Sequence, residues 1–193
     1  MPVNALLWRF RREHDGIAAT EFAMIAPILL LLLMASVEFP RALGMSQNVT
    51  RAARTVADLV ARGGGADMDD VYAAAAAVAA PYDISGADLV ITAAGVYKNG
   101  TALSAKVCSA YARKGTAKKA GVALGEAPPA FAKDKARYLI VEMSVRYPVI
   151  FSAFPYSRDI TFERSIRWPV RQGDSVNGEA EIVLPGGNAC PKA

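Results

Sequence analysis

The chain has 193 residues, of which 53% are hydrophobic, with a formal net charge of +4, one histidine and two cysteines. None of the motifs G-x-S-x-G, H-E-x-x-H and C-x-x-C occurs, and the single histidine, His14, lies near the N-terminus. We therefore expect no enzyme, no cofactor, no metal site and no small-molecule substrate. The basic run from Arg113 to Lys119 contains no aromatic residue, so we expect no binding of nucleic acid.

An apolar run is the strongest feature of the chain. No charged residue lies between Phe22 and Val37, and Glu21 stands just before this stretch. As a helix, residues 17–39 would be roughly 34 Å long, which matches a hydrocarbon core of about 30 Å. The run predicts a transmembrane helix over these residues.

Charge beside the run predicts its orientation. Arg9, Arg11 and Arg12 precede it, and positive flanks stay on the cytoplasmic side. We expect residues 1–16 to form a cytoplasmic leader and the rest of the chain to lie outside. The run could also be a cleaved secretory signal, although Ala35-Ser36-Val37 makes a poor cleavage site, or a plain anchor that is never processed.

Glu21 distinguishes a plain anchor from a processed subunit. A carboxylate within an apolar helix costs free energy, less near the interface than at mid-membrane. A Glu at the boundary can reach headgroup water. It can also meet a positive charge: a cut after Gly16 would place a new α-amino group on Ile17, four residues before Glu21. One helix cannot easily close that pair, but two staggered helices can.

The segments Gly16-Ile17-Ala18-Ala19-Thr20-Glu21-Phe22, Ala23-Met24-Ile25-Ala26-Pro27 and Val37-Glu38-Phe39 resemble the N-terminus of TadE-like proteins, which are minor pseudopilins of the Flp (tight adherence) type IV pilus. The resemblance implies cleavage between Gly16 and Ile17 by a prepilin peptidase. Glu21 would be the fifth mature residue, and Phe22 would follow it where major pilins tend to carry tyrosine. The resemblance also implies assembly or priming of a pilus at the bacterial inner membrane, with other pilin and pilus-assembly subunits as partners.

Beyond the span, an apolar stripe with helical spacing predicts an amphipathic helix over residues 40–62. We expect a kink at Pro27, an interruption at Pro40, and an end at Gly63-Gly64-Gly65. A second helix is predicted from Asp67, as its cap, to Ala80, before Pro81. Residues 66–193 should form one periplasmic domain.

The spacing of apolar residues then changes to two. It predicts a strand around Leu89–Ala93, a turn at Asn99-Gly100, a return strand over Ala102–Ala110 and a loop from Arg113 to Asp134. Two further strands are predicted, over residues 139–149 and 160–170, joined through Pro155-Tyr156-Ser157. Arg164 falls on the apolar face of the last strand, which suggests a bulge or an edge position. The fold class is α+β and pilin-like, with a long N-terminal helix, a short second helix and a small antiparallel sheet.

Cys108 and Cys190 both follow the span and would reach an oxidising compartment. We expect a disulfide between them that ties the polar C-terminal segment to the second strand; the alternative is a pair of free, small apolar residues. The functional alternatives are an unprocessed single-span periplasmic binding or scaffold protein, and a membrane-tethered enzyme whose site carries no known motif.

Overall fold

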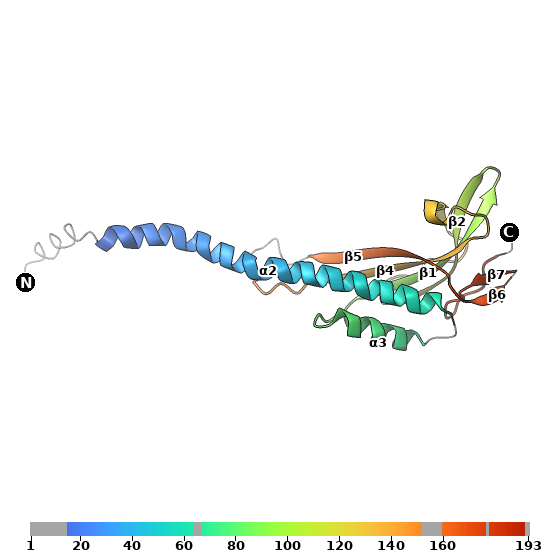
Figure 1. Cartoon of the computed structure of the whole chain (residues 1–193), viewed down its shortest axis with the longest axis horizontal. Coiled ribbons are helices and arrows are strands. Elements are labelled where there is room, and N and C mark those ends of the chain that lie inside the picture. The colour runs from blue at the N-terminus through green and yellow to red at the C-terminus, as the bar shows by residue number, and fades with distance from the viewer. Residues whose placement is uncertain (1–14, 64–66, 152–159, 177, 192–193) are drawn as a thin grey trace, which may run out of the picture.

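A computed structural model describes residues 15–63, 67–151, 160–176 and 178–191. One long helix lies against an antiparallel sheet over its C-terminal half and projects away from it over its N-terminal half (Figure 1). The elements, in chain order, are α2 (Asp15–Ala61), α3 (Met68–Ala79), β1 (Asp88–Asn99), β2 (Ala102–Arg113), β3 (Ala123–Glu126), the 3-10 turn η1 (Pro129–Phe131), β4 (Arg137–Arg146), β5 (Thr161–Pro169), β6 (Asp174–Val176) and β7 (Glu179–Glu181). The architecture is α+β, as the sequence predicts.

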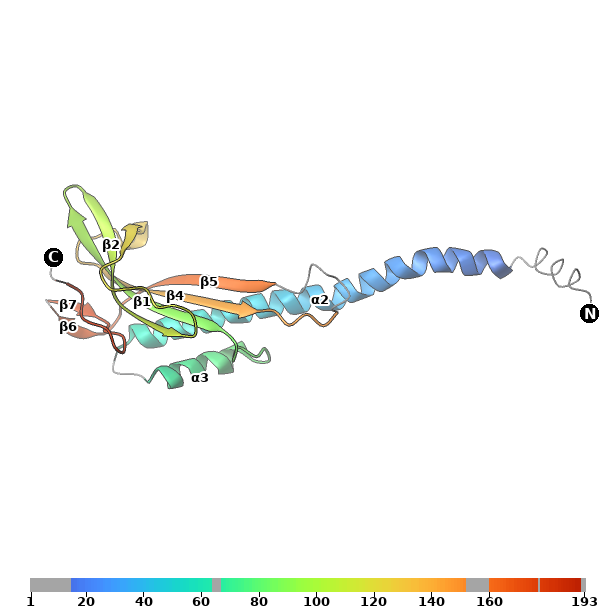
Figure 2. The same cartoon turned by 180° about the vertical axis from the view of Figure 1, so that it is seen from behind.

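Helix α2 is continuous over 47 residues and contains both Pro27 and Pro40. The predicted interruption at Pro40 is therefore wrong. Each proline removes one hydrogen bond of the helix, but both rings lie on the exposed side, where the helix can curve instead of ending. Both views show this curvature (Figure 2).

The second half of α2 supplies one side of the core. Its apolar stripe is fully buried at Val49, Ala52 and Val56, whereas Leu59 is only partly buried. Burial of a valine stabilises the fold by roughly 1.5–3 kcal/mol. This half of the helix is held in place by packing on β4, β5 and α3.

Helix α3 begins and ends within one residue of the prediction. The Asp67 side chain caps it by accepting a hydrogen bond from the Asp69 amide at 3.0 Å. Pro81 follows its last turn, where a missing amide prevents continuation.

The main sheet has five antiparallel strands in the order β3-β2-β1-β4-β5. The predicted hairpin of β1 and β2 is present, with Asn99 opposite Ala102 across the turn. The apolar face of β4 packs under the helices through Leu139, Val141 and Met143. The sheet curls, so that its β1-β2 end turns away from the long helix (Figures 1 and 2).

Two sequence predictions about the strands are wrong. The segment 113–134 is not only a loop, because β3 pairs with β2 and η1 follows it. In η1, the Phe131 ring stacks on Tyr138 with ring centroids 4.7 Å apart and covers the other face of the sheet. Strand β5 is not the last strand, because β6 and β7 form a separate hairpin after it. Pro155-Tyr156-Ser157, residues 1–14 of the predicted leader and Gly64-Gly65 lie outside the described residues.

Arg164 lies on the edge strand β5, and its register with β4 is unbroken. Of the two predicted explanations, the edge position is right and the bulge is wrong. The guanidinium crosses to the long helix: its Nε donates to Thr50 Oγ1 at 2.9 Å and its Nη2 donates to Ser46 Oγ. A charged residue on an apolar face is therefore satisfied by hydroxyl groups of α2.

Candidate functional site

We call the projecting part of α2, residues 16–37, the rod. None of its residues is buried, and Phe22 is 68% exposed. The helix is long and apolar enough to cross a membrane, and none of its most apolar window is buried within the chain. Such a continuous apolar surface requires a cover from outside this chain, and a single-pass membrane helix fits it.

The four residues predicted to serve processing and helix registration lie together at the free end of this rod. A Cβ placed on Gly16 would meet nothing within 4 Å, and Ile17 and Glu21 are exposed one helical turn apart. The Thr20 hydroxyl between them donates to the Ile17 carbonyl at 2.8 Å. Among the residues that the structure describes, none forms an ion pair with Glu21.

Polar contacts fix the helix to the sheet where the rod leaves the domain. The Ile150 amide donates to the Glu38 carboxylate at 3.3 and 3.4 Å, and the Tyr147 hydroxyl donates to the Glu38 carbonyl at 3.3 Å. Burial raises the pKa of Tyr147 to about 12, and the nearby Glu38 carboxylate adds to this shift. Tyr147 therefore keeps its proton, and its role as donor, throughout the physiological pH range.

A cavity of about 500 Å³ lies beside this junction and is mostly apolar. We call it the junction cavity. Its lining residues come from α2 and from the chain around the facing ends of β4 and β5: Leu31, Met34, Ala35, Glu38, Phe39, Ala42, Tyr147, Val149, Phe151 and Ile160.

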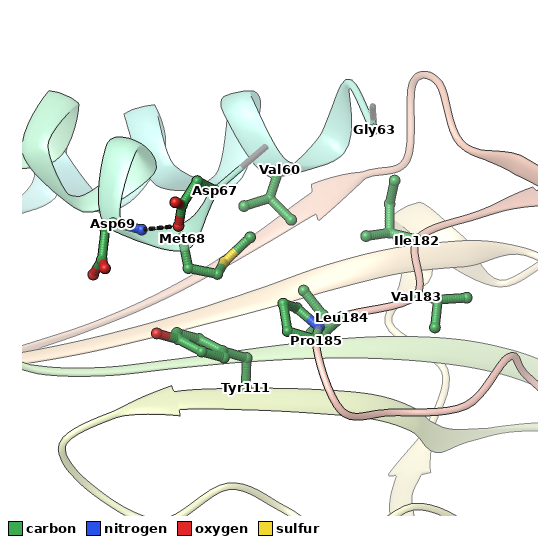
Figure 3. A pocket seen from close by; sticks show the side chains of 10 residues that line it. All are labelled: Val60, Gly63, Asp67, Met68, Asp69, Tyr111, Ile182, Val183, Leu184 and Pro185. Carbon is green, nitrogen blue, oxygen red and sulfur yellow. Dashed lines mark hydrogen bonds between the residues drawn. The ribbon is translucent and has the colours of Figure 1, made fainter. Parts of the chain in front are cut away.

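A second cavity, of about 520 Å³, lies at the opposite end of the domain, between α2, α3, β2 and the segment after β7 (Figure 3). Its carboxylates have structural partners: Asp67 caps α3, and Asp69 lies 3.8 Å from Arg113. Within the described part of the chain, no group of three or more His, Cys, Asp or Glu side chains could hold a metal ion. The polar groups lining this cavity suit helix capping better than acid-base chemistry.

The predicted disulfide between Cys108 and Cys190 is present. Cys108 lies in β2 where the register shifts: Ser109 pairs with Ala93, and Val107 pairs with Ala94. The extra residue of a β-bulge is free of the ladder, so the Cys108 side chain can leave the strand's regular alternation. The bond joins the C-terminal segment to β2.

A buried ion pair beside the disulfide escaped the sequence analysis. Arg137 Nε and Glu181 Oε2 are 3.3 Å apart, with only 6% and 2% of the two side chains exposed. The Cys190 amide donates to the other Glu181 oxygen at 2.9 Å. The sequence Asn177-Gly178 could have predicted the β6-β7 turn, as Asn99-Gly100 did for β1-β2, but no local pattern marks Glu181 as buried.

Residues 16–58 match the family described as TadE-like protein. The match starts at the predicted cleavage residue and ends inside α2, so it covers the rod and much of the packed half of the helix. It confirms the resemblance seen in the sequence and supports involvement in the Tad pilus system. No curated protein matches the chain. No solved structure matches it either.

Proposed function

From the match of residues 16–58 to TadE-like protein, we propose that this chain is a minor pilin-like subunit that acts in assembly or priming of the Flp (tight adherence) pilus. Its role is structural rather than catalytic. The observation that carries the proposal is the bare apolar rod, 16–37, with Glu21 near its free end and a compact α+β domain at the other.

The proposal divides the chain by function. Residues 1–16 are the cytoplasmic leader, 17–39 span the inner membrane, 40–62 continue as the amphipathic helix, and 66–193 form the periplasmic domain. The arginines before the span support this orientation. The disulfide supports it as well, because such bonds persist in oxidising compartments.

Processing between Gly16 and Ile17 creates a positive charge that can pair with the Glu21 carboxylate. The exposed position of Gly16 suits access by a prepilin peptidase. The cut leaves an α-amino group on Ile17, which is positively charged near neutral pH. In the membrane, the Glu21 carboxylate of one subunit attracts the amine of a neighbour shifted along the helix axis, because charges attract strongly where water is excluded. Glu21 thereby sets the register of adjacent rods, and Phe22 belongs to the segment that the peptidase recognises.

Intact mass of the protein purified from cells with and without a prepilin peptidase tests the processing. We expect a loss that corresponds to residues 1–16 only when the peptidase is present. An unchanged mass in both strains would favour the unprocessed single-span scaffold protein instead.

A substitution tests the role of Glu21. Glu21→Ala should still insert into the inner membrane but abolish piliation, whereas the neighbouring exposed substitution Thr20→Ala should leave pili intact. Membrane fractionation measures the first property, and electron microscopy of cells the second. Normal pili in Glu21→Ala would remove Glu21 from the assembly mechanism.

A further inference from the structure

We propose that the junction cavity takes an acyl chain of a phospholipid from the outer leaflet, so that the β4-β5 end of the domain rests in the membrane surface. This inference relies on the membrane-spanning rod of the proposed function. It adds a second membrane contact, made by the folded domain.

The depth of the cavity follows from the length of the span. A hydrocarbon core needs about 20 helical residues. If the core begins at Ile17, about 20 residues carry it past Ala35, and if it begins at Phe22, it extends further along the helix. In both cases Leu31, Met34 and Ala35 lie at the depth of the lipid chains. These three residues line the part of the cavity nearest the membrane core, and Glu38, Phe39 and Ala42 line it further along α2.

The domain's side of the cavity is apolar too. Val149, Phe151 and Ile160 line it. Ile150, beside them, is 45% exposed, and Ile160 is 39% exposed. The hydrogen bonds of Glu38 to the Ile150 amide and the Tyr147 hydroxyl hold this segment against the rod. Because these bonds prevent the segment from standing away from the helix, its apolar side chains reach the membrane interface.

The size of the cavity selects its occupant. A helix with its side chains is about 10–12 Å across, whereas 500 Å³ corresponds to a cube with an edge of roughly 8 Å. The rod of a second copy could therefore insert single side chains but not its whole width. A single hydrocarbon chain is narrower, and lipid chains already surround the rod at this depth. Water is a poor occupant, because few polar groups line the cavity and a buried water needs two to four of them.

Fluorescence quenching in proteoliposomes tests the contact. Single cysteines introduced by Leu29→Cys, Ile150→Cys and Val122→Cys would carry an environment-sensitive dye, while the native cysteines stay bonded to each other. Leu29, 53% exposed, reports on the span, and Val122, 47% exposed, is the matched control. The full-length protein is reconstituted at less than one copy per vesicle in phosphatidylcholine with a quencher at acyl carbon 5 or carbon 12.

The control lies far from the junction along the sheet. The Val122 carbonyl accepts a hydrogen bond from the Val107 amide in β2. Val107 pairs with Ala94 in β1, and Ala94 pairs with Tyr138 in β4, so Val122 lies at the level of Tyr138 along the sheet. Tyr138 is eight residues from Arg146, at the junction end of β4, which is about 26 Å along a strand. A dye at Val122 should therefore stay clear of the lipid.

We expect carbon-5 lipid to quench the Ile150 dye at least twofold more than the Val122 dye, and more strongly than carbon-12 lipid does. If lipid quenches the Leu29 dye but quenches the Ile150 dye no more than the Val122 control, the inference is overturned and the proposal that the rod spans the membrane stands. No quenching at Leu29 would overturn both. The Ile150 dye could instead report an apolar environment only at several copies per vesicle, with no quenching by lipid. That result would assign the junction cavity to a second copy and would also overturn the inference. Ile160→Cys replaces Ile150→Cys if that variant loses its disulfide on a non-reducing gel.

Discussion

Removal of the disulfide should destabilise the domain strongly, because the bond closes a long loop. Cys108 and Cys190 are 82 residues apart in the sequence. In the chain-entropy model, a cross-link over such a loop lowers the entropy of the unfolded chain by an amount worth about 4.5 kcal/mol at 25 °C. We therefore expect the double substitution Cys108→Ala with Cys190→Ala to lower the free energy of unfolding by up to about 4.5 kcal/mol.

Urea unfolding of the full-length protein in detergent, followed by tryptophan fluorescence, measures this loss. With a slope of about 2 kcal/mol per M, the midpoint should fall by roughly 2 M. Each single substitution breaks the same bond, so the two single variants and the double variant should agree within about 1 kcal/mol. An unchanged midpoint in the double variant would refute the loop-closure reasoning. A large loss in Cys108→Ala with little loss in Cys190→Ala would instead assign the effect to packing of the buried Cys108 side chain.

Two further predictions concern the charged contacts of the domain. Glu181→Ala leaves Arg137 buried without its partner and should lower the free energy of unfolding by about 3–5 kcal/mol in the same assay. The control Glu179→Ala, on the same short strand, should change it by no more than about 0.5 kcal/mol. An equal loss in both variants would assign the effect to disruption of the strand and not to the ion pair. The hydrogen bond from Arg62 holds the pKa of Asp58 below its ordinary value of 3.8. The stability from Asp58 is therefore complete above pH 3.8 and is lost as the pH falls through the lower folded pKa. In Asp58→Asn, the free energy of unfolding should therefore fall less steeply as the pH drops below 3.8. The same dependence on pH in the variant and the unmodified protein would contradict this reasoning.

The sequence predicts the helices better than the strands, for a local reason. Cap, periodicity and stop signals of α3 lie within a few residues of one another, and the apolar stripe of α2 follows from spacing alone. Pro40 misled the prediction, because a proline removes one hydrogen bond but leaves the rest of a strongly helical segment intact. Strand β3 escaped prediction because its four residues, rich in small side chains, become a strand only by pairing with β2.

The proposed processing site could be located from the sequence because its parts are neighbours in the chain. Gly16, Ile17 and Glu21 are separated by fixed numbers of residues, and the length and lack of charge of the following run are properties of composition. The junction cavity could not be located in this way, since one wall comes from residues 31–42 and the other from Tyr147, Val149, Phe151 and Ile160.

By itself, the sequence determined a membrane-length helix, its flanking charges and the family to which that helix is similar. Only the tertiary structure decided that half of this helix is bare and half is packed, that Arg164 is satisfied by hydroxyl groups of α2, and that Arg137 and Glu181 form a buried pair beside the disulfide. The physical reason is sequence distance. Hydrophobicity and helical periodicity are set by neighbouring residues, whereas burial and ion pairing depend on which distant segments the folded chain brings into contact.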